Sequence, residues 1–525
     1  MINVIYPGSS SQSGGIVASA LVRSCSASQV RQASISQFAA CNGRSETDCW
    51  VLVDPLDAWV DSIIKASTQP YSKIIVFGKL PQALAQHLGV EVSPLDAMLV
   101  EAAKCLPAKP KQFSQSAAAI HYTGVLGERK SPISHRPFLR YDFTDEWNNL
   151  GYGAITADAS IWSLSQTAVL SGLQCLAQVV IENQPVSAYL AVWDTPQCGL
   201  LWFNRAVGPV DSQEWCLVEH FIANYRHAEL PCWPVLREVP YGYSSAVTMR
   251  LDCDEAVESA RGLWNTYQEL GVPFSLALHA QVLADPLNHT LPVEVLANGG
   301  ALLSHTATHA PNWGGSYAAA YVEAIDSAKI IRQATGHQVK YAVSPFHQTP
   351  DYARAALSDA GYAGCIGGII RNDPDFLTAR AGTVPGTGRG FIGHSQQCML
   401  HGDCVLEGSE PMAVYKQAFD MAKAGGAFFG FLEHPFSTRY QYGWLTEAQR
   451  IAFHRDFLVY IRKTGNALFC NESDAMDFLG QRADISIVSI EGGFYVNQSQ
   501  QATRWNVGVE YRGQLAEITS GGVQL

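Results

Sequence analysis

Two histidines, His305 and His309, stand four residues apart in the segment ALLSHTATHA, directly after an apolar run. Imidazoles at this spacing can bind one metal ion. Earlier in the chain, the segment RLDCDE places Asp252 and Asp254 at the end of another apolar run. Strand alternation puts both carboxylates on the same side, where they repel each other unless a cation or a shared proton relieves them. These four residues therefore predict a metal site.

One carboxylate and two imidazoles form a common catalytic zinc shell that leaves positions open for water and substrate. The second carboxylate could then act as a base on a water molecule. Each piece alone has a simpler explanation: a strand-end aspartate often caps the next helix, and a histidine pair in a loop is often hydrogen-bonded surface. The combination at successive strand ends favours the metal site.

The surrounding sequence predicts the scaffold for such a site. From about residue 245, short apolar strands alternate with amphipathic helices, which indicates a parallel-strand α/β barrel or open sheet. Such folds place their active sites at the carboxyl ends of the strands. Polar residues follow the predicted strands at these ends, namely Asp252, Asp254, His279, His305, Ser344 and His434.

Four segments in this order, RLDCDE, SHTATH, VSPF and FGFLEHP, resemble the motifs of the NodB-homology polysaccharide deacetylases, carbohydrate esterase family 4, over residues 245–475. HTATH matches the family's H-[ST]-x-x-H motif, SPF its proline-aromatic motif, and Leu432, Glu433 and His434 its late L-x-H motif. The resemblance implies a distorted (β/α) barrel of NodB type. It also implies a divalent metal ion, usually zinc, and hydrolysis of an acetyl group on a sugar.

By position, the resemblance implies that Asp254, His305 and His309 hold the metal. Asp252 would be the general base and His434 the general acid. The backbone N–H near Phe346 would stabilise the oxyanion together with the metal.

The chain departs from the family pattern in three ways. Cys253 separates the two carboxylates, which are usually adjacent, and no tryptophan-containing fourth motif is found. Val343 stands where the family has an arginine that orients the base, so Arg250 and Arg371 are candidates to replace it. These departures leave open that the activity is lost.

Other segments suggest contacts around the site. Substrate-binding residues are predicted to be Trp313, Pro345, Phe346 and Arg439. Trp313 could stack on a sugar ring or belong to the core, and the loop that carries Arg439, Tyr440, Tyr442 and Trp444 could line the cleft or pack. A second metal site, or an inert cleft loop, is predicted for His394, Cys398, His401 and Cys404.

Three regions are expected. Residues 1–240 alternate strands and helices in a flavodoxin- or Rossmann-like α/β pattern, with a break near 105–140 that could separate two subdomains. Residues 241–480 form the barrel, and residues 481–525 a small antiparallel β-element. The early segment YPGSSSQSGG could cradle a phosphate at a helix start or be a plain turn, since it lacks the P-loop lysine.

Composition limits the function classes. The 525 residues carry a net charge of -12 at a pI near 5.7, which argues against a nucleic-acid partner or an anionic membrane surface. Neither a secretory signal nor an apolar run long enough to span a membrane is seen, so no membrane insertion is expected. The thirteen scattered cysteines suit reduced thiols, and a cytoplasmic location is predicted.

The leading hypothesis is a zinc-dependent deacetylase that acts on an acetylated sugar or glycan, including nucleotide- or lipid-linked sugars. Two alternatives stay open. One is a related metal-dependent amidohydrolase that opens another C–N bond, such as that of a cyclic ureide. The other is a catalytically inactive, carbohydrate-binding homologue in a biosynthetic assembly.

Overall fold

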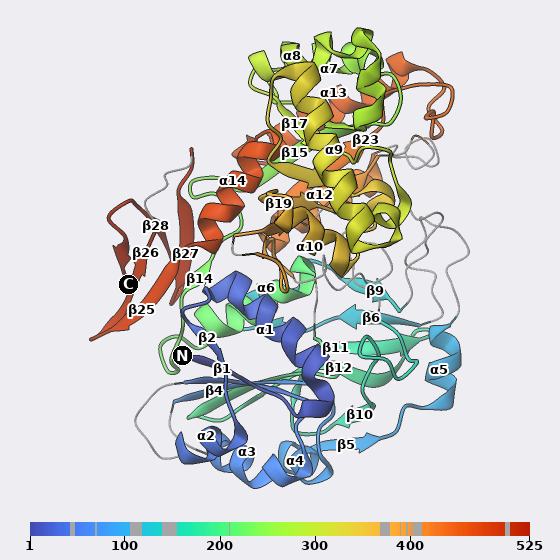
Figure 1. The fold of residues 1–525 in the computed structure, drawn as a ribbon. Coiled ribbons are helices and arrows are strands. Elements are labelled where there is room, and N and C mark those ends of the chain that lie inside the picture. The colour runs from blue at the N-terminus through green and yellow to red at the C-terminus, as the bar shows by residue number, and fades with distance from the viewer. Residues whose placement is uncertain are drawn as a thin grey trace.

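The computed structural model describes most of the chain, namely residues 1–41, 48–68, 71–104, 118–138, 155–208, 211–367, 379–388, 390–394, 397–400, 402, 412–498 and 504–525. Its two lobes are each built on one large sheet (Figure 1). The N-terminal lobe lies below in this view, and the lobe with the predicted site lies above it. A small group of strands near the C-terminus lies beside both.

The N-terminal lobe contains a nine-stranded sheet in the order β2-β1-β3-β4-β13-β12-β11-β6-β9. Its first half is parallel and consists of β1 Ile2–Ile5, β2 Val30–Gln32, β3 Cys49–Val53, β4 Ser72–Phe77 and β13 Cys198–Phe203. Its second half is antiparallel and consists of β12 Gln184–Asp194, β11 Gln174–Ile181, β6 Ala118–Tyr122 and β9 His135–Pro137. The predicted parallel α/β sheet is therefore present, and antiparallel strands extend it.

Helices cover both faces of this sheet. Helix α1 Ser11–Cys25 and helix α6 Ser212–Ala223 lie between the sheet and the upper lobe (Figure 1). Below the sheet lie α2 Ile35–Cys41, α3 Val60–Ser67 and α4 Gln82–Leu88. Two further strands, β5 Val90–Ser93 and β10 Thr167–Leu170, pair with each other, and the lobe also carries α5 Ala97–Ala103, β7 Val125–Leu126 and β8 Arg129–Lys130. Most β1, β3 and β4 side chains are fully buried because helices cover both faces.

The second lobe is a curled, mostly parallel sheet in the order β20-β21-β19-β18-β17-β16-β15-β23-β22, with β24 also paired to β15. Its strands are β15 Ser245–Cys253, β16 Ser275–Leu278, β17 Ala301–Ser304, β18 Tyr341–Val343, β19 Gly364–Ile366, β20 Gly382–Thr383, β21 Ile392–His394, β22 Gln397–Met399, β23 Phe428–Glu433 and β24 Ala467–Phe469. Among the strands described in this lobe, β20 is the one that pairs antiparallel. This half-barrel agrees with the barrel-like fold predicted from the alternating pattern.

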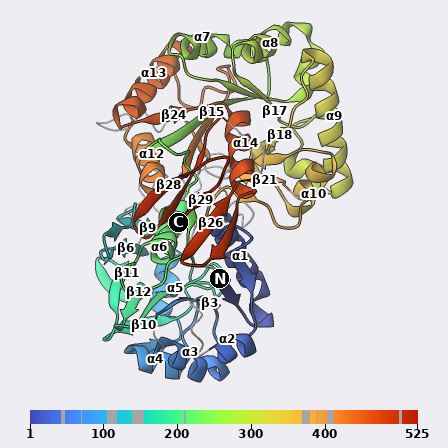
Figure 2. The same cartoon turned by 90° about the vertical axis from the view of Figure 1, so that its left-hand side faces the viewer.

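Helices surround the outside of the curled sheet (Figure 2). They are α7 Arg261–Glu269, α8 Thr290–Ala297, α9 Tyr317–Thr335, α10 Asp351–Asp359, α12 Ala413–Gly425 and α13 Glu447–Lys463. Local sequence sets their ends: the Ser316 hydroxyl caps α9 by accepting from the Ala319 N–H, and Gly336 ends it at a positive φ of 75°. These helices cover the outer face of the sheet, and the loops that follow the strands lie at the carboxyl ends of the strands.

The C-terminal strands attach to the segment that connects the two lobes. In this segment β14 Val235–Leu236 pairs with β27 Val507–Tyr511, which pairs in turn with β28 Gln514–Ile518. Strands β25 Ser486–Ile490, β26 Gly493–Asn497 and β29 Val523–Gln524 form a second small sheet. The tail is thus antiparallel as predicted, and it also anchors the connector.

One hydrophobic cluster is shared by both lobes and the tail. It includes Val4 of β1, Trp215 of α6, Leu303 of β17 and Val509 of β27, and α14 Glu472–Ala483 contributes Phe478. The second lobe has a further cluster of its own. Ten cysteines whose side chains the structure describes are free thiols. Among the described helices, none combines the length and the hydropathy of a membrane span.

Candidate metal centre and active site

The predicted site residues lie at the carboxyl ends of three strands of the curled sheet. Asp252 belongs to β15 and Asp254 follows it, His305 and His309 follow β17, and His434 follows β23. Because these strands run parallel, their carboxyl ends meet at one edge of the sheet. Asp252 and Asp254 both line one small cavity there, as their alternation predicts, while Cys253 between them is buried in the core.

Asp254, His305 and His309 form a group that fits a metal ion. Their ligand atoms all lie within 4.8 Å of one another. Asp254 Oδ1 is 3.4 Å from the Nε2 atoms of both histidines and has no hydrogen-bond partner in the described structure. A buried carboxylate oxygen without a donor is costly, and a cation relieves that cost.

The histidine tautomers agree with this fit. His305 Nδ1 lies 3.2 Å from the Val343 carbonyl, so Nδ1 carries the proton and Nε2 presents its lone pair. His309 Nε2 lies 3.1 Å from His305 Nε2. Burial, followed by the nearby His305, lowers the pKa of His309 to about 4, which keeps this imidazole neutral at pH 7. Two imidazole Nε2 atoms that face one carboxylate oxygen are suited to bind a divalent cation together with it.

Asp252 is held by an arginine from its own strand. Arg250 is fully buried, and its Nε donates to Asp252 Oδ1 at 2.7 Å. The buried Glu472 faces the other side of this guanidinium at 3.8 Å. Burial alone would raise the pKa of Asp252, but Arg250 and His305 outweigh it and bring the pKa below its usual value. Asp252 is therefore ionised at neutral pH, as a base requires. Of the two candidates for the missing motif arginine, Arg250 contacts Asp252, and Arg371 lies outside the described residues.

His434 is positioned by the loop that follows it. Its ring stacks on Tyr440 with centroids 4.4 Å apart and an interplanar angle of 6°. The Tyr440 hydroxyl donates to Asp254 Oδ2 at 2.9 Å, and His434 Nε2 lies 3.4 Å from the same oxygen. From α13, the buried Arg450 donates to the His434 carbonyl at 2.5 Å. These contacts fix the His434 ring beside the metal group.

The cavity enclosed by these residues has a volume of about 140 Å³. Phe346 lies on its wall, with its ring centroid 4.6 Å from that of His309, and the adjacent Pro345 is buried. His347 also lines the cavity and is 4% exposed, and its Nδ1 has no hydrogen-bond partner in the described structure. Sequence reasoning missed His347; its position directly after the proline-aromatic motif was the available signal.

Other predicted contacts separate into two groups. Arg439, Tyr440 and Tyr442 line the cavity, whereas Trp444 is buried in the core. Trp313 is also fully buried, and its Nε1 donates to the Gln348 carbonyl. The prediction that Trp313 stacks on a sugar is therefore wrong, and the core alternative describes it.

The second metal site stays a prediction. His394 and Cys398 are buried on β21 and β22, while His401 and Cys404 lie outside the described residues. Among the residues that are described, Asp254, His305 and His309 form the one group whose geometry could hold a metal ion.

Acid is expected to destabilise the metal-free protein. Burial lowers the pKa of His347 to about 3 and that of His394 to about 4. Below pH 6.5 these two histidines are protonated in the unfolded chain, whereas in the folded chain they stay neutral until the pH approaches their lowered pKa values. The free energy of unfolding should therefore fall between pH 6.5 and 4.5, by about 1.4 kcal/mol per pH unit for each histidine. Urea unfolding across this range measures the slope; His394→Gln should reduce it, and an unchanged slope would contradict the assignment.

Comparisons with family models and with curated proteins gave no match. Solved structures match the second lobe. A carbohydrate esterase family 4 domain of a multidomain xylanase, from the hindgut metagenome of Trinervitermes trinervoides, is 14% identical, with 45% of this chain and 91% of that chain covered and a TM-score of 0.31. An allantoinase is 13% identical, with 46% and 92% covered and a TM-score of 0.36.

A pseudoenzyme of carbohydrate esterase family 4 from Bacillus anthracis is 12% identical, with 45% and 66% covered and a TM-score of 0.31. These identities and scores are low. Over about 45% of the chain, its structural neighbours include carbohydrate esterase family 4 polysaccharide deacetylases, the family that the sequence motifs resemble.

Proposed function

We propose that the protein is a metal-dependent hydrolase that removes an acetyl group, most readily an N-acetyl group, from a sugar of a polysaccharide or glycoconjugate. The observation that carries this proposal is the cavity at the strand ends. Asp254, His305 and His309 form a group there that could hold a metal ion. Beside it lie Asp252, which is paired with Arg250, and His434, which stacks on Tyr440. A base, an acid and a cation site around one cavity are the parts that amide hydrolysis needs.

Each residue has one task in this proposal. Asp254, His305 and His309 hold the metal ion, zinc in our proposal, which when bound polarises the acetyl carbonyl and lowers the pKa of water. Asp252 accepts the proton of the attacking water. His434 donates a proton to the leaving nitrogen, because an amine is a poor leaving group while unprotonated.

The cavity size supports a small reacting group. Its volume of about 140 Å³ is below the several hundred Å³ of sites that enclose drug-sized ligands. We infer that it takes the acetyl end, while Arg439, whose side chain is 66% exposed at the rim, contacts the rest of the sugar. The ion pair between Arg250 and Asp252 supports an active enzyme over an inactive homologue, since the base has its partner.

Metal content and product formation test the proposal. Purified wild-type protein given zinc or cobalt should hold about one divalent ion per chain, and His309→Ala should lose it. His227→Ala, at an exposed histidine of the other lobe, is the matched control and should keep the ion. Wild type should release acetate from N-acetylated sugar oligomers. A wild type that holds no divalent metal would overturn the proposal; opening of cyclic ureides without acetate release would favour the amidohydrolase alternative.

A further inference from the structure

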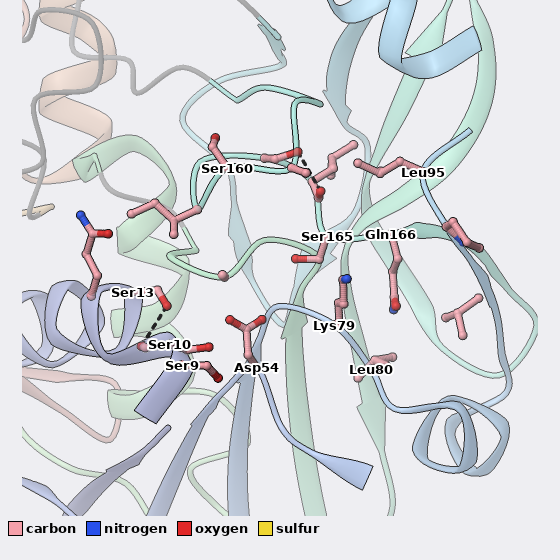
Figure 3. Close-up of a pocket in the computed structure, with 18 of the residues that line it drawn as sticks. Ser9, Ser10, Ser13, Asp54, Lys79, Leu80, Leu95, Ser160, Ser165 and Gln166 are labelled. Carbon is pink, nitrogen blue, oxygen red and sulfur yellow. Dashed lines mark hydrogen bonds between the residues drawn. The ribbon is translucent and has the colours of Figure 1, made fainter. Parts of the chain in front are cut away.

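A second cavity lies in the N-terminal lobe and has a volume of about 820 Å³. None of the residues around the acetyl site lines it. It opens where β1, β3 and β4 end (Figure 3). Its walls come from the segments that follow these strands, from residues 92–95 at the end of β5, from residues 159–166 and from Ala206. A cavity of this volume can enclose a ligand the size of a nucleotide or a sugar phosphate.

The strand order explains why a cavity forms here. Strands β2 and β3 flank β1 on its two sides. The chain leaves β1 into α1 above the sheet and leaves β3 into α3 below it (Figure 1). Loops that diverge from neighbouring parallel strands leave a crevice at the carboxyl edge, and open α/β sheets bind their ligands in this crevice.

The crevice is rich in hydrogen-bond donors. The amino end of α1 carries the positive end of the helix dipole. Ser9, Ser10 and Ser13 lie beside it, and the Ser13 hydroxyl donates to the Ser10 carbonyl at 3.1 Å. Lys79, which directly follows the turn after β4, adds an exposed ammonium group. Asp54 is the acidic residue on the wall; it accepts from the Ser10 hydroxyl and the Lys79 N–H.

A buried donor without a partner points to a ligand. Gln166 is 6% exposed, lines the cavity, and its Nε2 has no hydrogen-bond partner in the described structure. Its backbone is fixed, because Asn204 Nδ2 donates to the Gln166 carbonyl at 2.7 Å and the Ser165 N–H donates to the Asn204 carbonyl at 3.1 Å. A buried N–H group without an acceptor is costly unless a bound molecule supplies the acceptor. Figure 3 shows Gln166, Ser165 and Lys79 around the same hollow as Asp54.

We propose that this crevice binds a phosphate ester of a hydroxylated small molecule, a sugar phosphate or a nucleotide. The phosphate lies at the amino end of α1 and pairs with Lys79, where dipole and charge both favour an anion. Gln166 donates to an oxygen of the ligand, and Asp54 accepts from one of its hydroxyls. The site is separate from the acetyl cavity, so the proposal does not depend on the deacetylase function.

Calorimetric titration of the full-length protein tests the site. The probes are inorganic phosphate, a hexose 1-phosphate, a nucleoside diphosphate sugar and the unphosphorylated hexose. Both esters, or one of them, should bind more tightly than inorganic phosphate, and the unphosphorylated hexose should not bind. The preferred ester distinguishes a sugar phosphate from a nucleotide. Lys79→Ala and Gln166→Leu should each weaken binding about tenfold, the effect of losing one hydrogen bond to a charged or buried group.

Two controls separate this site from other effects. Lys65→Ala removes an exposed lysine from α3 outside the crevice and should leave binding unchanged. His309→Ala should also leave it unchanged, which distinguishes failure here from failure at the metal centre. Absence of saturable binding by either ester at millimolar concentration would overturn the proposal. Equal binding by wild type and the Lys79→Ala, Gln166→Leu double variant would overturn it as well.

Discussion

Asp252→Asn is expected to lower the turnover of an acetylated substrate by about a hundredfold to ten-thousandfold, the usual contribution of a general base. Asparagine keeps the shape of the side chain and cannot accept a proton from water at neutral pH. The metal should stay, because the three proposed ligands are Asp254, His305 and His309. Acetate release at saturating substrate, together with elemental analysis, measures both quantities on one preparation.

Asp477→Asn is the matched control for this substitution. Asp477 belongs to α14, and its side chain is 39% exposed and pairs with Lys340. The control should keep full turnover. An Asp252→Asn enzyme that holds its metal and keeps wild-type turnover would show that another group accepts the proton. Loss of the metal as well would assign Asp252 to the metal shell.

Arg250→Met is expected to destabilise the protein by about 3–5 kcal/mol at pH 7, the usual cost of removing one partner from a buried ion pair. The Asp252 carboxylate would remain buried without its guanidinium, and its pKa in the folded state would rise above the unfolded value near 4. The loss in the free energy of unfolding is then fully present above that folded-state pKa. It becomes smaller as the pH falls toward 4, because protonation removes the unpaired charge. Urea unfolding at several pH values measures it.

A second arginine provides the comparison. The Arg354 side chain is 2% exposed, but its partner Asp351 is 87% exposed. Arg354→Met therefore leaves no buried carboxylate behind and should cost less than Arg250→Met. If both variants lose the same free energy of unfolding and neither loss depends on pH, Arg250 stabilises the protein through its packing and not through its charge. Asp252→Asn in the Arg250→Met background should restore part of the stability, since both charges are then gone.

Much of the candidate site could be predicted because strand ends are visible in a sequence. Asp254, His305 and His309 follow apolar runs, and parallel strands bring such positions to one edge. The partner of Asp252 could be narrowed only to Arg250 or Arg371, because the pattern does not say which long side chain turns toward a carboxylate. The choice between sugar stacking and the core for Trp313 stayed open for the same reason, since a tryptophan in a loop can face the solvent or the core.

Some features of the fold could likewise be predicted from the sequence, and others could not. The alternation of strands and helices predicted the curled parallel sheet and the parallel half of the N-terminal sheet. The pairing of β14 with β27 joins residues more than two hundred and fifty positions apart and has no local signal. The antiparallel half of the N-terminal sheet joins β13 to β12 and β6 to β11, and the strand pattern alone does not choose these partners.

The hydrophobic cluster shared by both lobes and the tail has a consequence for how the chain can be divided. Arg482 of α14 donates to the carbonyls of Leu236 and Arg237 in the segment that connects the two lobes. Hydrogen bonds therefore join the same parts of the chain as this cluster. A gene fragment that encodes the second lobe alone would expose apolar surface that the intact chain buries. The two lobes are therefore expected to unfold as one cooperative unit, and neither is expected to stay folded when it is expressed alone.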